Sequence, residues 1–139
     1  MSSSSHLGDR KPFMARLNQM YGWVTDTEGN IDEEWIQVDF DRTVVVDSIY
    51  TQGCNECIQI RWVKSYRLSY LSDSDNWKQY NHVVYGQVLP GNSDAATVVS
   101  TRLIPPIVTR TVKLQIAEIY DAAGLNRGGL RLDMAGCDF

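Results

Sequence analysis

The 139-residue sequence lacks the features that define several common functional classes. No apolar run approaches the 18 or more residues of a membrane-spanning helix, and residues 1–6 include no apolar signal region. The 13 Lys and Arg residues against 17 Asp and Glu give a net charge of −4, and the basic residues never cluster beyond pairs such as Arg10-Lys11. We therefore expect neither a membrane-spanning protein nor a nucleic-acid binder.

Catalytic and metal-binding patterns are also scarce. The two histidines, His6 and His82, lie outside any motif that would activate a nucleophile, and no phosphate-binding glycine loop is present. The CxxC pair Cys54 and Cys57 lacks the further ligands that zinc needs, and the strand-like segment after it is unlike the helix of a redox motif. Acidic pairs suited to glycoside cleavage occur on any acidic surface. We therefore expect no enzyme and no cofactor.

Short runs with period-two alternation indicate β-strands. Turn-forming clusters at 26–30, 72–76 and 90–94 separate these runs, at intervals too short for crossover helices. The pattern predicts one all-β antiparallel sandwich or jelly roll over residues 1–139, with Pro105-Pro106 between strands or on an edge. The expected strands are Trp35–Phe40, Thr43–Ile49, Ile58–Val63, Tyr66–Tyr70, Thr97–Val99, Thr111–Ile116 and Leu130–Met134.

Acidic residues are densest between positions 26 and 34, where their oxygens suit calcium. Their spacing does not match an EF-hand loop, so the sequence favours a solvated loop and leaves a calcium site as the alternative. The residues concerned are Asp26, Glu28, Asn30, Asp32, Glu33 and Glu34.

An ordered series of motifs covering nearly the whole chain resembles the discoidin domain, also called the coagulation factor five/eight type C domain. The resemblance implies an eight-stranded, galactose-binding-like jelly roll without catalysis, found in secreted or cell-surface proteins. The motifs are Ala15-Arg16-Leu17-Asn18, Gly22-Trp23, Trp35–Phe40, Thr51-Gln52-Gly53, Ser65–Tyr70, Asn76-Trp77, Pro90-Gly91-Asn92, Thr109-Arg110 and Leu130–Cys137.

The family pattern also implies a first cysteine before the serine-rich segment, paired with the cysteine of the terminal Gly-Cys. Here the family's first strand and first cysteine are missing, which a truncated chain or a natural variant would both explain. We therefore expect Cys137 to be free. Cys54 and Cys57 either form a short disulfide in the third loop or remain two thiols.

In this family, three loops at one end of the barrel, called spikes, bind ligands as different as phospholipids, sugars, collagen and peptide C-termini. By position, the matching loops here begin at His6, Asp26 and Asn55. The candidate ligand-binding residues are His6, Leu7, Arg10, Thr25, Asp26, Thr27, Glu28, Asn55, Glu56, Ile58 and Arg61.

The nature of these residues favours a cell-surface glycan or an extracellular protein over phospholipid. Membrane-binding members carry pairs of large apolar residues with basic neighbours, whereas only Leu7 and Ile58 are expected at these tips, beside Asp9 and Glu56. Arg61 replaces a pocket Tyr of peptide-binding members and would suit a sugar clamp, unless it points to solvent from its strand.

Three arginines in the family motifs, Arg16, Arg110 and Arg131, are interpreted as structural. We expect each to form an ion pair with an acidic residue at a strand end.

Overall fold

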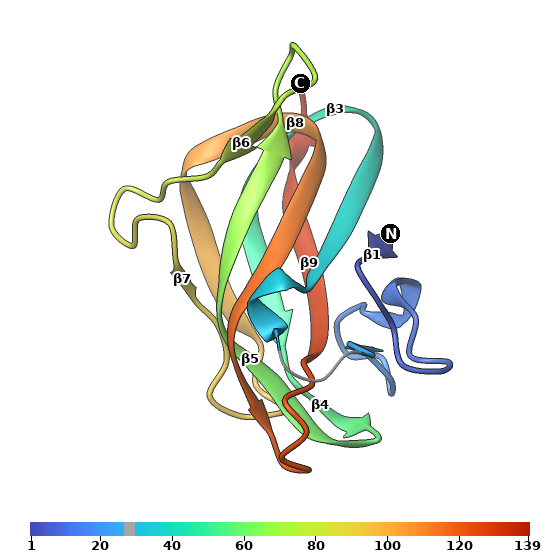
Figure 1. The fold of residues 1–139 in the computed structure, drawn as a ribbon. Helices are drawn as coiled ribbons and strands as arrows, with labels where there is room; N and C mark the ends of the chain where they lie inside the picture. Colours follow the sequence, from blue (N-terminus) through green and yellow to red (C-terminus); the bar gives the residue numbers. More distant parts are fainter. Residues whose placement is uncertain (27–29) are drawn as a thin grey trace.

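The structure is a computed structural model that describes residues 1–26 and 30–139. The described strands pair antiparallel in the order β2-β9-β3-β8-β5-β4, while β1 pairs with β3, and β6 and β7 pair with β5 (Figure 1). The predicted all-β antiparallel class is confirmed. The elements are β1 (Ser2–Ser3), η1 (Pro12–Met14), β2 (Trp23–Val24), η2 (Ile31–Glu33), β3 (Trp35–Gln52), β4 (Cys54–Cys57), β5 (Gln59–Leu71), β6 (Trp77–Gln79), β7 (Leu89–Pro90), β8 (Val99–Asp121) and β9 (Gly129–Asp138).

Strand alternation produces the core. Ile36 is buried, and Val38 and Phe40 pack against the same cluster, as predicted for the apolar face of the run 35–40. The sheet curls so that β5 and β9 come into contact, and the core lies inside the curl. Trp23 is the largest fully buried side chain, and its indole N–H donates to the Ser5 carbonyl at 2.7 Å.

Several sequence-based strand boundaries were wrong, and the expected strands 58–63 and 66–70, for example, form the single strand β5. The expected strands 35–40 and 43–49 form one long strand, β3, because register shifts after Asp39 and after Val46 absorb the irregular residues. Pro105-Pro106 does not separate two strands but lies within β8. Val46 of β3 pairs with Ile107 and Ser48 pairs with Arg102, so residues 103–106 of β8 form a bulge opposite β3. The two prolines lie in this bulge, where the sheet needs no backbone hydrogen bonds from them.

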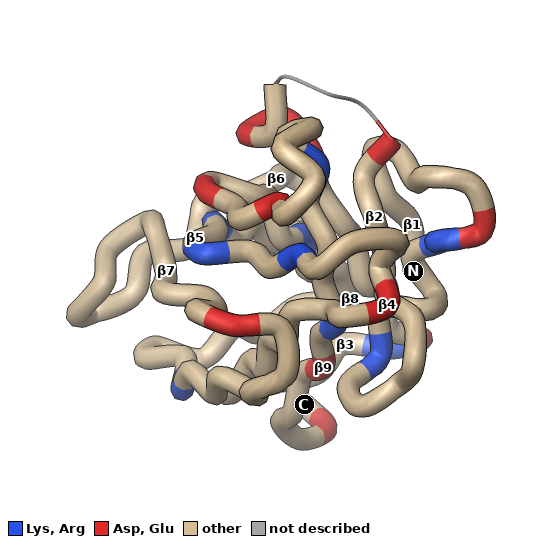
Figure 2. The backbone as a smooth tube through the Cα atoms, turned by 90° about the horizontal axis from the view of Figure 1, so that it is seen from below, with Lys and Arg blue, Asp and Glu red and all other residues tan. Residues whose placement is uncertain are grey.

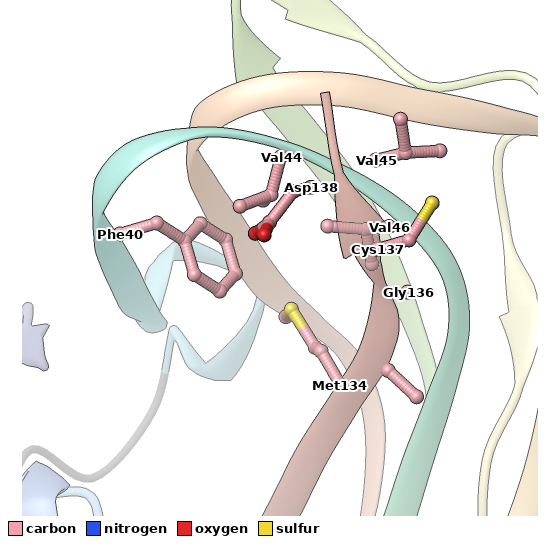
Figure 3. A pocket seen from close by; sticks show the side chains of 9 residues that line it. Phe40, Val44, Val45, Val46, Met134, Gly136, Cys137 and Asp138 are labelled. Carbon is pink, nitrogen blue, oxygen red and sulfur yellow. The ribbon is translucent and has the colours of Figure 1, made fainter.

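The two ends of the barrel differ in character. At the lower end in Figure 1, the β4–β5 hairpin and the loop 121–128 project side by side, and β2 lies nearby. We call this the spike end. Near the opposite end, a cavity of about 190 Å³ lies between β3 and the last residues of β9 (Figure 3). Phe40, Val44 and Met134 line it, with the Asp138 carboxylate directed among them.

Candidate functional site

A disulfide between Cys54 and Cys57 fixes the third spike. The bridge is buried in a small cluster with Val24, so the hairpin is tied to β2 beneath it. Ile58 follows with a φ of 71° and an exposed side chain, which places it at the hairpin tip. Asn55 and Glu56 are also exposed, as expected for ligand-binding positions. Of the two alternatives left open by the sequence, the structure confirms the bridge.

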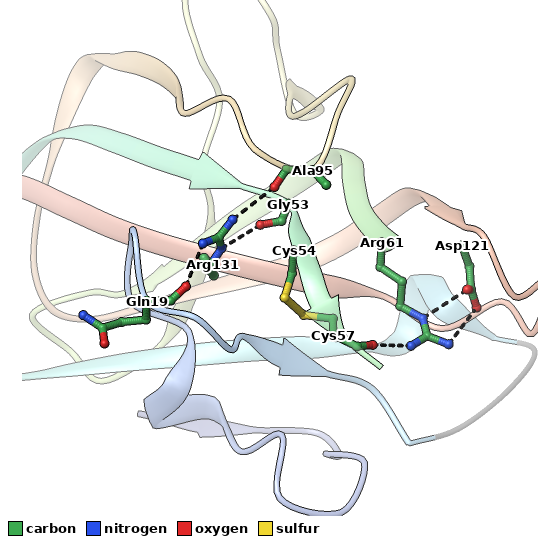
Figure 4. Close-up of a disulfide and its surroundings, with 8 residues drawn as sticks. All are labelled: Gln19, Gly53, Cys54, Cys57, Arg61, Ala95, Asp121 and Arg131. Atoms are coloured by element: carbon green, nitrogen blue, oxygen red, sulfur yellow. Dashed lines mark hydrogen bonds and ion pairs between the residues drawn. A yellow bond between two sulfur atoms is a disulfide. The ribbon is translucent and has the colours of Figure 1, made fainter. Parts of the chain in front are cut away.

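Arg61 does not reach a ligand surface. Its side chain is only 1% exposed, and its Nε forms an ion pair with Asp121 Oδ1 at 3.1 Å (Figure 4). Its Nη1 donates to the Cys57 carbonyl, which joins the hairpin to the end of β8. A side chain at Gly129 would collide with Arg61, so the glycine is needed for this close approach. The expectations that Arg61 clamps a sugar or points to solvent were both wrong.

The partner of Arg61, Asp121, was missed in the sequence. Besides the guanidinium, its carboxylate accepts the backbone N–H groups of Ala123, Leu125 and Arg127 at 2.9, 3.2 and 3.0 Å, so it organises the loop 121–128. Burial tends to raise the pKa of Asp121, but the hydrogen bonds from Arg127 and Ala123 and the charge of Arg61 outweigh it and lower that pKa. The signal in the sequence was an Asp ending a strand run, directly before Ala122 and a Gly-containing turn.

The second spike divides into a buried part and an exposed part. Thr25 is fully buried, and its Oγ1 accepts the N–H of Gly128 at 2.9 Å, so its role is structural and not that of a ligand contact. The Asp26 side chain is exposed, while its N–H donates to Ser5 Oγ and its carbonyl accepts from Arg127. Thr27 and Glu28, the other expected binding residues here, lie outside the described residues.

The first spike is mostly folded against the others. Leu7 is not an exposed apolar tip, because its side chain is half-buried against the disulfide cluster. Its backbone N–H donates to the Val24 carbonyl at 2.8 Å and holds this part of the loop against β2. Arg10 is half-buried, with its guanidinium 4.3 Å from the Tyr21 ring centre. His6 is exposed. Among the predicted residues that the structure describes, the exposed ones are His6, Asp26, Asn55, Glu56 and Ile58.

The described acidic residues before β3 do not lie together as calcium ligands, and Glu28 lies outside the described residues. Glu34 is buried and accepts hydrogen bonds from the hydroxyls of Ser4 and Ser5, which turns its carboxylate toward the N-terminal segment. Asp32 and Glu33 are exposed on η2. Within residues 1–26 and 30–139, no three His, Cys, Asp or Glu side chains come together as metal ligands.

The three family arginines fulfil different roles. Arg16 forms the expected ion pair, with Asp133 at 2.9 Å. Arg110 contacts the backbone carbonyl of Asp41. Arg131 is buried and donates to three carbonyls, those of Gln19, Gly53 and Ala95, at 2.7, 2.7 and 3.1 Å (Figure 4). The ion-pair expectation was therefore wrong for Arg110 and Arg131, which bind backbone carbonyls among the described residues. Arg131 ties three loops to the base of the spike end.

Cys137 is free and exposed, as predicted. We expect thiol titration of the unfolded chain to find one reactive thiol without reductant and three after reduction. A non-reduced count of none would mean that Cys137 is paired, and a count of three would mean that the Cys54–Cys57 bridge is absent.

The part of the chain that the structure describes contains no helix long and apolar enough to cross a membrane.

Comparison with known proteins identifies relatives of the chain. Coagulation factor V of Sus scrofa is 33% identical over 146 residues, an alignment that covers 99% of this chain and 6% of that protein. The chain thus spans less than a tenth of this relative.

Among solved structures, discoidin II of Dictyostelium discoideum superimposes with a TM-score of 0.77 at 22% identity, covering 99% of this chain and 54% of that one. The family 32 carbohydrate-binding module from C. perfringens NanJ, solved in complex with galactose, gives a TM-score of 0.69 at 12% identity, covering 96% of this chain and 90% of the module. These likenesses confirm the jelly-roll fold. The F5/8 type C domain profile matches residues 1–132. The chain belongs to the F5/8 type C, or discoidin, domain family.

Proposed function

We propose that this chain is an extracellular, non-catalytic recognition module that binds a glycan or a protein ligand through the spike end, for adhesion or recognition. One observation carries the proposal. The backbone of Asp26 is held by Ser5 and Arg127, while its side chain is exposed beside the frame that the disulfide and Arg61 make rigid. A fixed frame with exposed polar groups lowers the entropy lost on binding a ligand.

The chemistry of the exposed groups suits sugar hydroxyls. Asp26 and Glu56 offer carboxylate acceptors, and Asn55 offers both a donor and an acceptor. Ile58 adds an apolar contact at the hairpin tip. The galactose complex of the family 32 module supports a glycan ligand on this fold.

A phospholipid surface is the second candidate, supported by the exposure of Ile58 and the similarity to coagulation factor V. Leu7 is half-buried and contributes little to insertion. The acidic Asp26 and Glu56 would also be repelled by an anionic membrane over about 8 Å at physiological salt. A glycan or protein ligand is therefore favoured over a phospholipid surface.

The test is binding of the chain to a glycan array and to phosphatidylserine vesicles, alongside the Asp26→Ala variant. Because the contacts of Asp26 with other described residues are made by its backbone, the variant should fold normally. Losing a charge-assisted hydrogen bond of about 1.5–3 kcal/mol should weaken glycan binding at least tenfold. Asp73→Ala, which removes an exposed acid at the opposite end, is the matched control and should bind as the parent does.

Glycan binding equal in parent and Asp26→Ala would contradict the proposed site. Vesicle binding that requires phosphatidylserine and is lost in Ile58→Asp would instead identify the phospholipid module. Binding to neither the array nor the vesicles would favour a protein ligand. A pull-down with the parent chain, compared with Asp26→Ala, would then test whether such a ligand binds at the spike end.

A further inference from the structure

A second exposed feature lies on the side of the barrel, away from the spike end. In Figure 1 the loop between β6 and β7 projects sideways, while the spike loops point down. Its turn carries Val83, Val84 and Tyr85, which are 68%, 74% and 49% exposed. We call these three residues the apolar tip. Exposed apolar side chains grouped on one projection mark an interaction site more often than isolated ones do.

The apolar tip is uncharged over a long stretch of chain. No Lys, Arg, Asp or Glu occurs from Gln79 to Ser93. Figure 2 shows this loop free of charged positions, in contrast to the loops around the spike end. The adjacent segment of β8 from Leu103 to Thr109 is also uncharged, and Ile104 there is 47% exposed.

The backbone donors of the tip are all satisfied within the protein. His82 and Gly86 exchange two N–H···O bonds of 2.8 and 2.9 Å, and Val83 N donates to the Ile104 carbonyl at 2.9 Å. Val84 N and Tyr85 N both donate to Nδ1 of His82, at 3.0 and 3.3 Å. The five N–H groups from residue 82 to 86 therefore need no water.

The histidine that satisfies this turn is itself held in place. Because His82 Nδ1 accepts two hydrogen bonds, its proton lies on Nε2, which donates to the Arg102 carbonyl at 2.8 Å. The ring is buried and contacts Tyr85, with ring centres 4.8 Å apart. Gly86 closes the turn at a φ of 69°, a conformation that other residues rarely adopt. The tip is thus a preformed projection.

A turn with satisfied N–H groups, apolar side chains and no charge is suited to shallow burial at a lipid surface. Each unsatisfied N–H group carried into hydrocarbon would cost several kcal/mol, and this turn carries none. Tyr85 has the amphipathic side chain that concentrates at the membrane–water interface. A protein partner fits less well, since a stable protein interface uses about 20–30 residues from each side.

From these observations we propose that the apolar tip inserts into the interfacial region of an uncharged lipid surface. The proposal is independent of the ligand at the spike end. Because the tip lies on the side of the barrel, the spike end remains free for a second ligand when the tip is inserted. The tip would thus hold the domain on a membrane that carries the spike-end ligand.

Co-sedimentation of the chain with pure phosphatidylcholine vesicles tests this proposal. The parent should bind, and the double variant Val83→Asp/Val84→Asp should bind at least about tenfold more weakly, because a carboxylate is costly to move into lipid. Val98→Asp introduces the same charge at an exposed valine outside the tip, so this control should bind as the parent does. Near-ultraviolet circular dichroism verifies that each variant is folded.

Absence of parent binding to phosphatidylcholine, or equal losses in the tip and control variants, would overturn the proposal. So would binding that requires phosphatidylserine and depends on Ile58. A lipid-free dimer, seen by light scattering and dissociated by Val83→Asp/Val84→Asp, would show that a second copy covers the tip and would equally overturn it.

Discussion

Replacing Arg61 by methionine should lower the free energy of unfolding by about 3–5 kcal/mol, because it leaves the carboxylate of Asp121 buried without its cation. The side chains of the pair are 1% and 3% exposed, so water cannot take over the role of the guanidinium. Methionine keeps much of the apolar volume of the arginine side chain. The decrease in the free energy of unfolding therefore measures the loss of the charge and of the hydrogen bond to the Cys57 carbonyl. Chemical denaturation at pH 7 measures it.

The double variant Arg61→Met/Asp121→Leu is the control for this prediction. Removing both charges together eliminates the unpaired carboxylate, so part of the lost stability should return. The backbone N–H groups that Asp121 accepts would still lose their partner, and recovery should be incomplete. A loss below about 1 kcal/mol in Arg61→Met would mean that water enters the pair.

Asp121 also makes stability depend on pH, through the backbone N–H groups of Arg127 and Ala123 and the charge of Arg61. The pKa of Asp121 is lower in the folded chain than its ordinary value of about 3.9. Its contribution is therefore fully present above that value and is lost as pH falls through the folded pKa. Parent stability should decline below about pH 4, and this part of the decline should be absent in Asp121→Asn.

The fold was largely predictable because it depends on local alternation and on an ordered set of motifs. Ile36 and its neighbours on the core face follow from the period-two pattern of a single strand. The strand limits were less predictable. The bulges that join the two halves of β3 and accommodate Pro105 depend on pairing with distant residues.

The spike end was predicted in position but not in the roles of its residues. The alternation of side chains along a strand predicts that Arg61 points to the opposite face of the sheet from Ile60 and Trp62. It does not predict which of the two faces lies inside the barrel. The face is set by Asp121, which lies 60 residues further along the chain. Thr25 and Leu7 were misjudged for the same reason, since Gly128 and the disulfide cluster that bury them are brought in by other strands.

Arg131 should produce a second large effect. Its guanidinium is buried and donates to the carbonyls of Gln19, Gly53 and Ala95, and burial lowers its pKa without removing its charge at neutral pH. Arg131→Met would leave these carbonyls without their donor, at a cost of about 1–3 kcal/mol for each one that stays dry. We expect a total loss of about 3–5 kcal/mol, measured by denaturation at pH 7.

Arg16→Met is the matched control, because it removes an arginine from an exposed ion pair. Its partner is Asp133, and the two side chains are 57% and 31% exposed, so the variant should lose less than about 1 kcal/mol. Arg131→Lys should restore little, since a single ammonium cannot match the planar fork that reaches three carbonyls. If Arg131→Met were no worse than Arg16→Met, water would have to reach the base of the spike end. Amide hydrogen exchange of Arg131→Met distinguishes the two outcomes. If the Arg131 contacts matter, the segments 18–21, 52–54 and 94–97 should all lose protection together, and if water replaces these contacts, the three segments should keep their protection.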